Sequence, residues 1–237
     1  METQDTGARI GILCWETGQV PCGLMQLESL VGNGTNPASY DYPVRLHPVR
    51  GANVHTILED PDPAVLRTMI GDARAMVNDG IRAITTSCGF NAIFQHELAA
   101  AVPVPVFTSS LVQVPLARLI NGAQSEIAII TANSAALRPQ HLSSVGIDKL
   151  SGLHILGLEH CPEWNRMFAE PEQAIDLDVI EREVLGAARR AIEQHPAIRA
   201  FVLECTDLPP YAAMIRRATG LPVFDFITLV NYLHATL

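Results

Sequence analysis

Two of the five cysteines occupy matching places in the sequence and suit a shared role in chemistry. Cys205 follows Cys88 by 117 positions, and each comes directly after a short apolar run that predicts a strand. A segment that predicts the start of a helix comes next in both places. Near the positive end of a helix dipole, a thiol pKa is expected to fall below its usual value of about 8.5, and free backbone amides bind anions.

Two opposed thiols suit the exchange of a proton next to a carboxylate. A thiolate removes the proton from one face of the carbon, and a thiol returns it on the other face. Helix N-termini hold the small carboxylate substrate and stabilise the charge that develops, so neither a metal nor a cofactor is expected. Buried cysteine is more often a small hydrophobic residue, and we assign that role to Cys14, Cys22 and Cys161, which match no cysteine at the 117-residue offset.

Polar residues after other predicted strands are further candidates for the site. Asn133 and Ser134 follow a strand that ends at Thr131, and Ser109 follows another predicted strand. Each of these side chains could contact a substrate carboxylate or could cap the next helix, and the sequence favours neither role.

The segment from Glu16 to Pro43 is unusually long for a connection without regular structure. It leaves the same predicted sheet edge as the thiols, so we expect a lid or a ligand-binding loop. Part of it, Leu24–Leu30, could instead form a helical turn.

A repeat of 117 residues places the two cysteines in equivalent positions. Residues 81–107 align without a gap on residues 198–224, and eight of the 27 pairs are identical, against about two expected from average residue usage. The same offset aligns the apolar run 9–13 with 126–130. We infer an internal duplication; the alternative is two unrelated strand–helix units whose patterns look alike.

Each half of the chain alternates strand-like and helix-like patterns. Apolar runs predict strands at Ile10–Cys14, Val44–Pro48, Ala83–Thr86, Val104–Phe107, Ile127–Thr131, His154–Leu158, Ala200–Leu203 and Leu221–Phe224. Helices are expected over Ala64–Asn78, Phe90–Val102 and Ile180–Gln194. The predicted fold is α/β, with two pseudo-symmetric lobes, each a mostly parallel four-stranded sheet flanked by helices. Because ligands bind beyond the carboxyl ends of such strands, the site is expected in the cleft between the lobes.

We place the N-terminal lobe at residues 1–110 and the C-terminal lobe at residues 111–225. The apolar stretch 226–237 is predicted to pack back on the first lobe or against a second subunit. A homo-oligomer, either a dimer or a tetramer, is therefore expected.

Composition excludes several classes of protein. Hydrophobic residues make up 48% of the 237 residues and charged residues 17%, which excludes a disordered or coiled-coil chain. The net charge of −9 argues against nucleic-acid binding, and no apolar run is long enough to predict a membrane span. The polar N-terminus does not predict a secretory signal, and the odd number of cysteines suggests free thiols, so a cytoplasmic location is expected.

The segments around the cysteines, Thr86–Phe90 and Glu204–Leu208, resemble the paired motifs of the aspartate/glutamate racemase superfamily, which also contains hydantoin racemases, maleate isomerases and arylmalonate decarboxylases. The resemblance covers nearly the whole chain. It implies two α/β lobes, no cofactor, and the two cysteines as acid and base. It also implies a set of residues that hold the substrate carboxylate: Gly89, Phe90, Thr206, Thr131, Asn133 and Ser134.

The chain departs from the amino-acid racemases of that superfamily. Their first motif usually reads Cys-Asn-Thr, where this chain has Cys88-Gly89-Phe90, and their second usually has Gly where this chain has Glu204. Aspartate and glutamate are therefore not predicted as substrates. A narrower resemblance, to the algal dimethylsulfoniopropionate lyases, rests on residues 88–90, 108–111, 131–134, 203–211 and 219–225.

These observations leave three hypotheses for function. The first is an isomerase, a cofactor-independent racemase or epimerase that uses both thiols. The second is a carbon–sulfur lyase that begins with the same proton abstraction and then loses dimethyl sulfide by β-elimination. The third is a carboxylate-binding protein without turnover.

Overall fold

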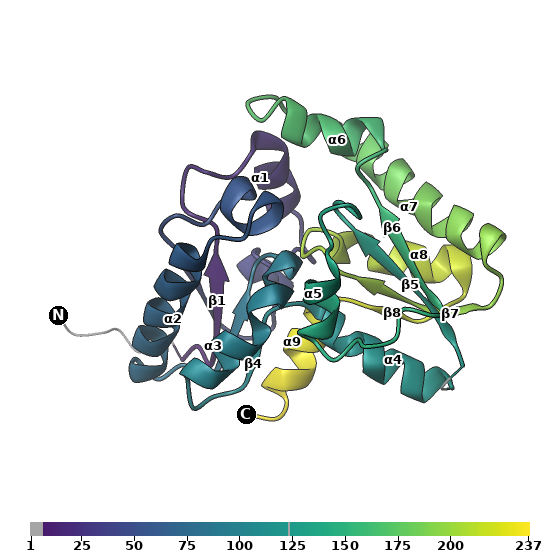
Figure 1. Cartoon of the computed structure of the whole chain (residues 1–237). Coiled ribbons are helices and arrows are strands. Elements are labelled where there is room, and N and C mark those ends of the chain that lie inside the picture. The colour runs from purple at the N-terminus through teal and green to yellow at the C-terminus, as the bar shows by residue number, and fades with distance from the viewer. Residues whose placement is uncertain (1–6, 123) are drawn as a thin grey trace.

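Two four-stranded parallel sheets, one in each lobe, form the framework of the computed structural model, which describes residues 7–122 and 124–237 (Figure 1). The first sheet has the strand order β2-β1-β3-β4 and the second has β6-β5-β7-β8. The strands are β1 (Ile10–Cys14), β2 (Val44–Pro48), β3 (Ala83–Thr86), β4 (Val106–Phe107), β5 (Glu126–Thr131), β6 (Leu153–Gly157), β7 (Ile198–Leu203) and β8 (Val223–Phe224). The α/β fold with two similar lobes is the predicted one.

Helices cover the sheets of both lobes (Figure 1). The α-helices are α1 (Cys22–Glu28), α2 (Pro63–Asn78), α3 (Gln95–Ala101), α4 (Val114–Asn121), α5 (Pro139–Ser143), α6 (Pro162–Ala169), α7 (Leu177–Gln194), α8 (Ala212–Thr219) and α9 (Phe226–His234). Short 3-10 helices are η1 (Pro37–Ser39), η3 (Gly89–Phe94), η4 (Ser110–Gln113) and η5 (Pro209–Tyr211), and η2 (Val54–Glu59) is a π-helix. Within the described parts of the chain, no helix combines the length and apolar character needed to cross a membrane.

The two long helices begin at side chains that cap them. Asp62 accepts a hydrogen bond from the backbone N–H of Ala64 at the start of α2, and Asp176 accepts two at the start of α7. A carboxylate at this position satisfies free amides and interacts favourably with the helix dipole. The buried face of α2 carries the apolar residues whose spacing predicted it: Val65, Met69, Ala73 and Met76.

The edge strands β4 and β8 are shorter than predicted. Each begins one residue after a proline, Pro105 or Pro222, and not at Val104 or Leu221. Proline has no N–H to donate to the sheet, so it marks the start of an edge strand.

The repeat extends to the pairing of the strands. Ile10 lies opposite Ala83 in the first sheet, and the residues 117 positions later, Ile127 and Ala200, lie opposite each other in the second. Likewise, the pair Thr85–Phe107 recurs as the pair Val202–Phe224. Both lobes therefore have the same strand order and the same register at these positions, which supports the inferred duplication.

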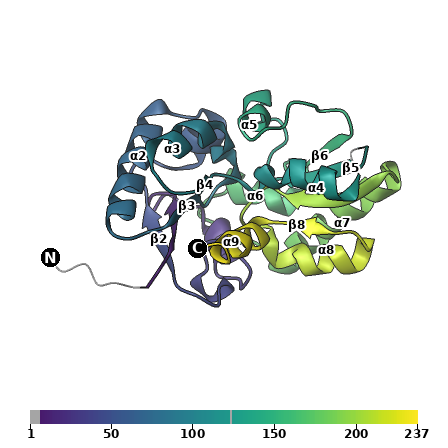
Figure 2. The ribbon, with the colours of Figure 1, turned by 90° about the horizontal axis from the view of Figure 1, so that it is seen from below.

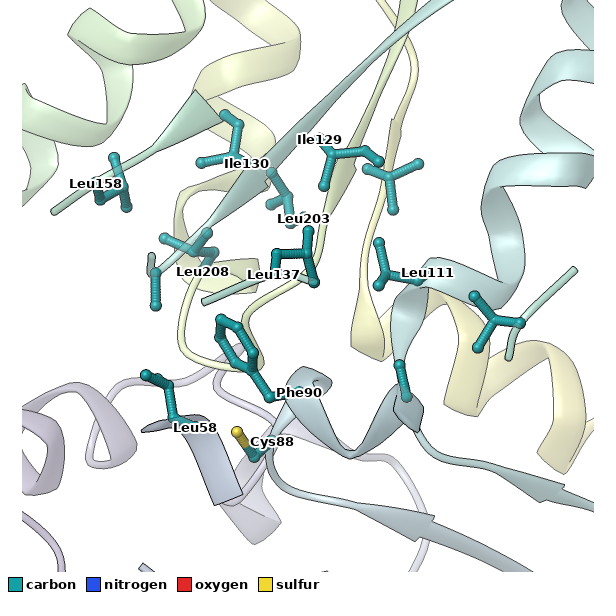
Figure 3. Packing of buried hydrophobic residues seen from close by; sticks show 14 of the residues in the cluster. Leu58, Cys88, Phe90, Leu111, Ile129, Ile130, Leu137, Leu158, Leu203 and Leu208 are labelled. Carbon is teal, nitrogen blue, oxygen red and sulfur yellow. The ribbon is translucent and has the colours of Figure 1, made fainter. Parts of the chain in front are cut away.

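A continuous apolar core joins the lobes. Figure 3 shows Leu58 and Phe90 of the first lobe facing Leu137 and Leu208 of the second, with Cys88 at the edge of this cluster. A smaller cluster brings residues of α9 against β1 and β3, namely Phe226 and Val230 with Ile10, Ile12 and Ala83. Figure 2 shows α9 at the junction of the lobes. The boundary at residue 110 stays a prediction.

Two segments near the cysteines differ from the expected elements. The helix expected over Phe90–Val102 is split into the 3-10 helix η3 and the separate helix α3. The segment Glu16–Pro43 contains α1 and η1, so it is partly helical, and its helix lies at Cys22–Glu28.

Candidate active site

Cys88 and Cys205 line one cavity between the lobes. Cys88 lies between β3 and η3, and Cys205 follows β7, so the two cysteines lie beyond the carboxyl ends of equivalent strands of the two sheets. The cavity has a volume of about 30 Å³, which is room for about two water molecules. It is lined by Trp15, Leu24, Glu28, Leu58, Ser87, Cys88, Gly89, Phe90, Ala132, Trp164, Phe168, Glu204, Cys205, Thr206 and Asp207.

Carboxyl groups and aromatic rings dominate this lining. Three carboxyls, those of Glu28, Glu204 and Asp207, share the cavity with the two thiols. Among the residues that the structure describes, no lysine, arginine or histidine lines it. A ligand with only negative charge is therefore disfavoured, whereas carboxylates and aromatic faces both attract a cation.

The second cysteine is hydrogen-bonded to one of these carboxyls. Cys205 Sγ donates to Asp207 Oδ2 at 3.4 Å, and the other oxygen, Oδ1, accepts from Asn33 Nδ2 at 2.7 Å. Asn33 Oδ1 accepts from both the N–H and the hydroxyl of Thr35, so its amide group must direct Nδ2 toward Asp207. The N-terminal lobe thus fixes the carboxylate beside Cys205.

Two further hydrogen bonds join the lobes at this point. The N–H of Gly34 donates to the carbonyl of Thr206 at 3.1 Å, and the hydroxyl of Thr206 donates to the carbonyl of Ser87. The segment around Asn33 is therefore attached to the turn that carries Cys205.

Glu204 is a buried carboxyl group behind the first cysteine. It is 0% exposed, and its Oε2 accepts a hydrogen bond of 2.8 Å from Thr131 Oγ1. Oε1 has no hydrogen-bond partner within the described residues. This oxygen lies so close to Gly89 that a Cβ there would come within 2.1 Å of it. The backbone after Cys88 can approach Glu204 only because residue 89 is glycine.

The expected fall in the thiol pKa values is wrong. Burial raises the pKa of Cys88 well above its usual value, and the charge of Glu204 adds to the rise. Burial and the charges of Asp207 and Glu204 raise the pKa of Cys205 in the same direction. The helices after the cysteines are short 3-10 segments, so their dipoles do not offset burial beside carboxyl groups.

The carboxyl groups are also shifted toward their protonated forms. Burial raises the pKa of Glu204 to about 7, although the hydrogen bond from Thr131 opposes the rise. Burial and the charge of Asp207 raise the pKa of Glu28 to about 7. Burial raises the pKa of Asp207 as well, against the opposing hydrogen bonds from Asn33 and Cys205. Glu28 and Glu204 therefore titrate near neutral pH.

The other residues suggested by sequence occupy different places. Gly89, Phe90 and Thr206 line the cavity. Thr131 lies behind it, bonded to Glu204. Ser109 is buried, and its hydroxyl accepts from the N–H of Leu111 as a helix cap.

Asn133 and Ser134 lie outside the lining of the cavity. Asn133 Oδ1 accepts from the N–H groups of Ala135 and Ala136, and the hydroxyl of Ser134 donates to Glu159. Asn133 and Glu159 line a neighbouring cavity instead. Both side chains are thus engaged with the protein's own groups.

Sequence reasoning missed several groups of the site. The sequence assigned Thr206 to the substrate carboxylate, and the hydroxyl of Thr206 donates to the carbonyl of Ser87. The sequence assigned no role in the site to Asp207, which accepts hydrogen bonds from Asn33 and Cys205. Glu28 was assigned no role. The acidic residues on both sides of Cys205 were the one visible signal, because buried acidic residues are uncommon unless they serve a site.

Comparisons with known proteins place this arrangement among enzymes. No protein-family model matches the chain. A dimethylsulfoniopropionate lyase from Durusdinium sp. clade D is 31% identical over 208 residues, which cover 86% of this chain and 69% of that protein. Dimethylsulfoniopropionate lyase 3 from Emiliania huxleyi (strain CCMP1516) is 32% identical over 216 residues, covering 87% of this chain and 56% of that protein. The chain thus spans little more than half the length of the second relative.

Solved structures share the fold at low sequence identity. An allantoin racemase from Pseudomonas fluorescens has a TM-score of 0.65 and 15% identity, covering 97% of this chain and 90% of the other. An aspartate racemase homologue from Pyrococcus horikoshii has a TM-score of 0.58 and 15% identity, covering 96% of this chain and 99% of the other. The chain therefore has the racemase-type two-lobed fold.

Proposed function

This chain belongs to the dimethylsulfoniopropionate lyase family, and on that basis we propose that it is a carbon–sulfur lyase that eliminates dimethyl sulfide from dimethylsulfoniopropionate. The reaction class is the second of the three hypotheses from the sequence. Its substrate carries a sulfonium cation at one end and a carboxylate at the other.

The lining of the cavity is the single observation that carries this proposal. Three carboxyl groups and the rings of Trp15, Trp164 and Phe168 surround a space with no basic residue among the described parts of the chain. A sulfonium group gains from both, because carboxylates attract its charge and aromatic faces attract cations. A substrate with a carboxylate alone gains from neither. We assign the substrate carboxylate to the backbone amides that follow the two cysteines.

We assign the base to Cys205, since its thiol already donates a hydrogen bond to Asp207. The proton of the thiol passes to Asp207 Oδ2, and the thiolate takes a proton from the carbon next to the substrate carboxylate. The electrons of that C–H bond form the double bond, the C–S bond breaks, and its electron pair leaves on dimethyl sulfide. The second product is acrylate. The sulfonium cation of the substrate favours the thiolate and so offsets part of the effect of burial, which raises the pKa of Cys205.

Racemisation is the second candidate, and one observation favours it. Cys88 and Cys205 occupy equivalent positions of the repeat and line the same cavity, as a two-base exchange requires. Both reactions begin with the same proton abstraction. They differ in whether the substrate carries a leaving group on the next carbon.

The test is incubation with dimethylsulfoniopropionate, with gas chromatography of dimethyl sulfide in the headspace and NMR of acrylate. The lyase proposal expects both products, and their loss in Cys205→Ser. Cys22→Ser is the matched control, because that thiol lies outside the cavity. Deuterium exchange in chiral carboxylates without dimethyl sulfide would favour the racemase. Binding without either reaction would leave the carboxylate-binding protein.

A further inference from the structure

Elimination, unlike racemisation, releases one proton for each substrate consumed. If the proposed lyase reaction is correct, the proton taken up by Cys205 must leave the cavity before the next turnover. Its route begins at the groups that contact Cys205 and ends at the groups that reach the surface.

We propose that Asp207 and Glu28 form a proton outlet that carries the proton from Cys205 to solvent. Asp207 is the first step, because Cys205 Sγ donates to its Oδ2 at 3.4 Å. Its other oxygen, Oδ1, accepts from Asn33 Nδ2 at 2.7 Å, so Oδ2 is the oxygen that faces the thiol and is placed to receive its proton. The rest of the route therefore begins at Oδ2.

Glu28 is the second step. It lines the same cavity as Asp207 and is the last residue of α1. It is partly exposed, and its neighbours on the helix include Met25, which is 52% exposed, and the exposed Ser29. The charge of Asp207 acts directly on Glu28. Glu28 thus connects the cavity with the outer surface of α1.

The other titratable groups near Glu28 do not offer an equivalent route. Glu204 is 0% exposed and bonded to Thr131. Cys14, on the neighbouring strand β1, has a pKa that burial raises to about 12, so it holds its proton. The remaining titratable groups that face Glu28 across the cavity are Asp207 and the thiols of Cys88 and Cys205.

Each transfer is balanced. The thiol of Cys205 gives its proton to the carboxylate of Asp207. Asp207 becomes neutral, and Cys205 becomes a thiolate. Asp207 then gives the proton to Glu28, directly or through one of the waters that the cavity has room for. Glu28 releases it to bulk water. A Glu28 pKa near 7 supports this role, because such a group both accepts and releases protons at neutral pH.

The test is Glu28→Gln, which keeps the size of the side chain and removes its titration. Because Glu28 also belongs to the lining that attracts the sulfonium group, both rates are measured at saturating dimethylsulfoniopropionate, where weaker binding is compensated. The rate of the first turnover, followed by rapid quench, is expected to fall much less than the steady-state rate, which falls about tenfold or more. Added imidazole or another small buffer base is expected to restore part of the steady-state turnover. The wild-type rise in kcat with pH through about 7 should be absent from Glu28→Gln. Glu193→Gln, on the exposed surface of α7, is the control.

Three results separate the alternatives. Wild-type steady-state kcat and pH profile in Glu28→Gln would overturn the outlet and leave the lyase proposal intact. An equal fall in the first turnover and in the steady-state rate at saturating substrate would also overturn it, because Glu28 would then act in the chemical step and not in the release of the proton. Absence of dimethyl sulfide from the wild-type enzyme would overturn the lyase proposal and the outlet together.

Discussion

The side-chain amide of Asn33 donates a hydrogen bond of 2.7 Å to Asp207, although the two residues are 174 positions apart. Asn33 belongs to the first lobe, and Asp207 follows the second cysteine in the other lobe. The carboxylate that accepts from the Cys205 thiol is therefore oriented across the boundary between the lobes. A change in the relative position of the two lobes would therefore alter the protonation of Cys205.

Asn33→Ala should reduce turnover more than substrate binding. It removes a hydrogen bond to a charged group, a loss of about 1.5–3 kcal/mol, or about 10- to 150-fold in kcat. The measurement is kcat and KM from dimethyl sulfide release over a range of pH. Asn36→Ala, in the same segment but bonded only to its own neighbours, should keep wild-type kcat. An unchanged pH profile in Asn33→Ala would contradict the orienting role.

Gly89→Ala should destabilise the fold. The new Cβ would meet Glu204 Oε1 at 2.1 Å and the Glu204 carbonyl at 2.3 Å, and overpacking of this kind costs about 1–3 kcal/mol. Urea unfolding measures the change in the free energy of unfolding. Gly71→Ala in α2 is the control: nothing lies within 4 Å of its Cβ, and alanine there should stabilise the helix by about 1 kcal/mol. Equal effects of the two substitutions would exclude the close approach at Gly89.

Alkylation of Cys88 and Cys205 by iodoacetamide should be slow at pH 7, and its rate should continue to rise with pH to well above pH 9. The thiolate is the reactive form, and burial beside Glu204 and Asp207 raises the pKa of both thiols. Mass spectrometry of the modified peptides follows each site separately. The urea-unfolded chain supplies the reference pH dependence of ordinary thiols. Half-maximal reactivity of either cysteine below pH 8 in the folded protein would contradict the raised pKa values.

Glu204 should make the fold less stable as the pH rises. Its pKa is higher in the folded protein, about 7, than in the unfolded chain, so the folded state binds its proton more tightly. This contribution is present below about pH 4.5 and is lost as the pH rises to about 7, a change of about 3 kcal/mol. The measurement is the difference in unfolding free energy between wild type and Glu204→Gln at several pH values. A constant difference would show that Glu204 ionises normally.

Phe168→Ala should speed the entry of bulky substrates. Phe168 lines the cavity that holds the two cysteines and also two neighbouring cavities. Because the first cavity has room for about two waters, side chains of its lining must move to admit substrate, and we expect Phe168 to be one of them. We expect a several-fold increase in kcat/KM for a diethyl analogue of dimethylsulfoniopropionate, relative to the dimethyl compound. An equal change for both compounds would argue against this entry route.

Much of the fold was predictable because its signals are local. The buried apolar runs gave the central strands β1, β3, β5 and β7 within two residues, and the 117-residue offset predicted their equivalence. The position of the two cysteines at strand ends followed from the same pattern. The starts of β4 and β8 were misplaced because the prolines before them were given too little weight.

The electrostatics of the site could not be predicted in this way. The pKa of a thiol at a helix start depends on what the rest of the chain places around it. Here Glu28, Glu204 and Asp207 share the cavity, and Asn33 orients Asp207 from the other lobe. The acidic residues beside Cys205 were visible in the sequence, but the approach of Glu28 and Asn33 to them was not, since it joins segments distant in the chain.

The duplication has a stereochemical consequence. At the 117-residue offset, Glu204 and Asp207 of the second copy correspond to Ser87 and Phe90 of the first, so the two walls around the cysteines are not equivalent. One wall carries two carboxyl groups and the other a hydroxyl and an aromatic ring. The two hydrogens on the carbon next to the substrate carboxylate are mirror-related, and such a cavity distinguishes them. Substrate labelled with deuterium at one of these hydrogens should therefore keep or lose its label almost completely, according to the face that it turns toward Cys205.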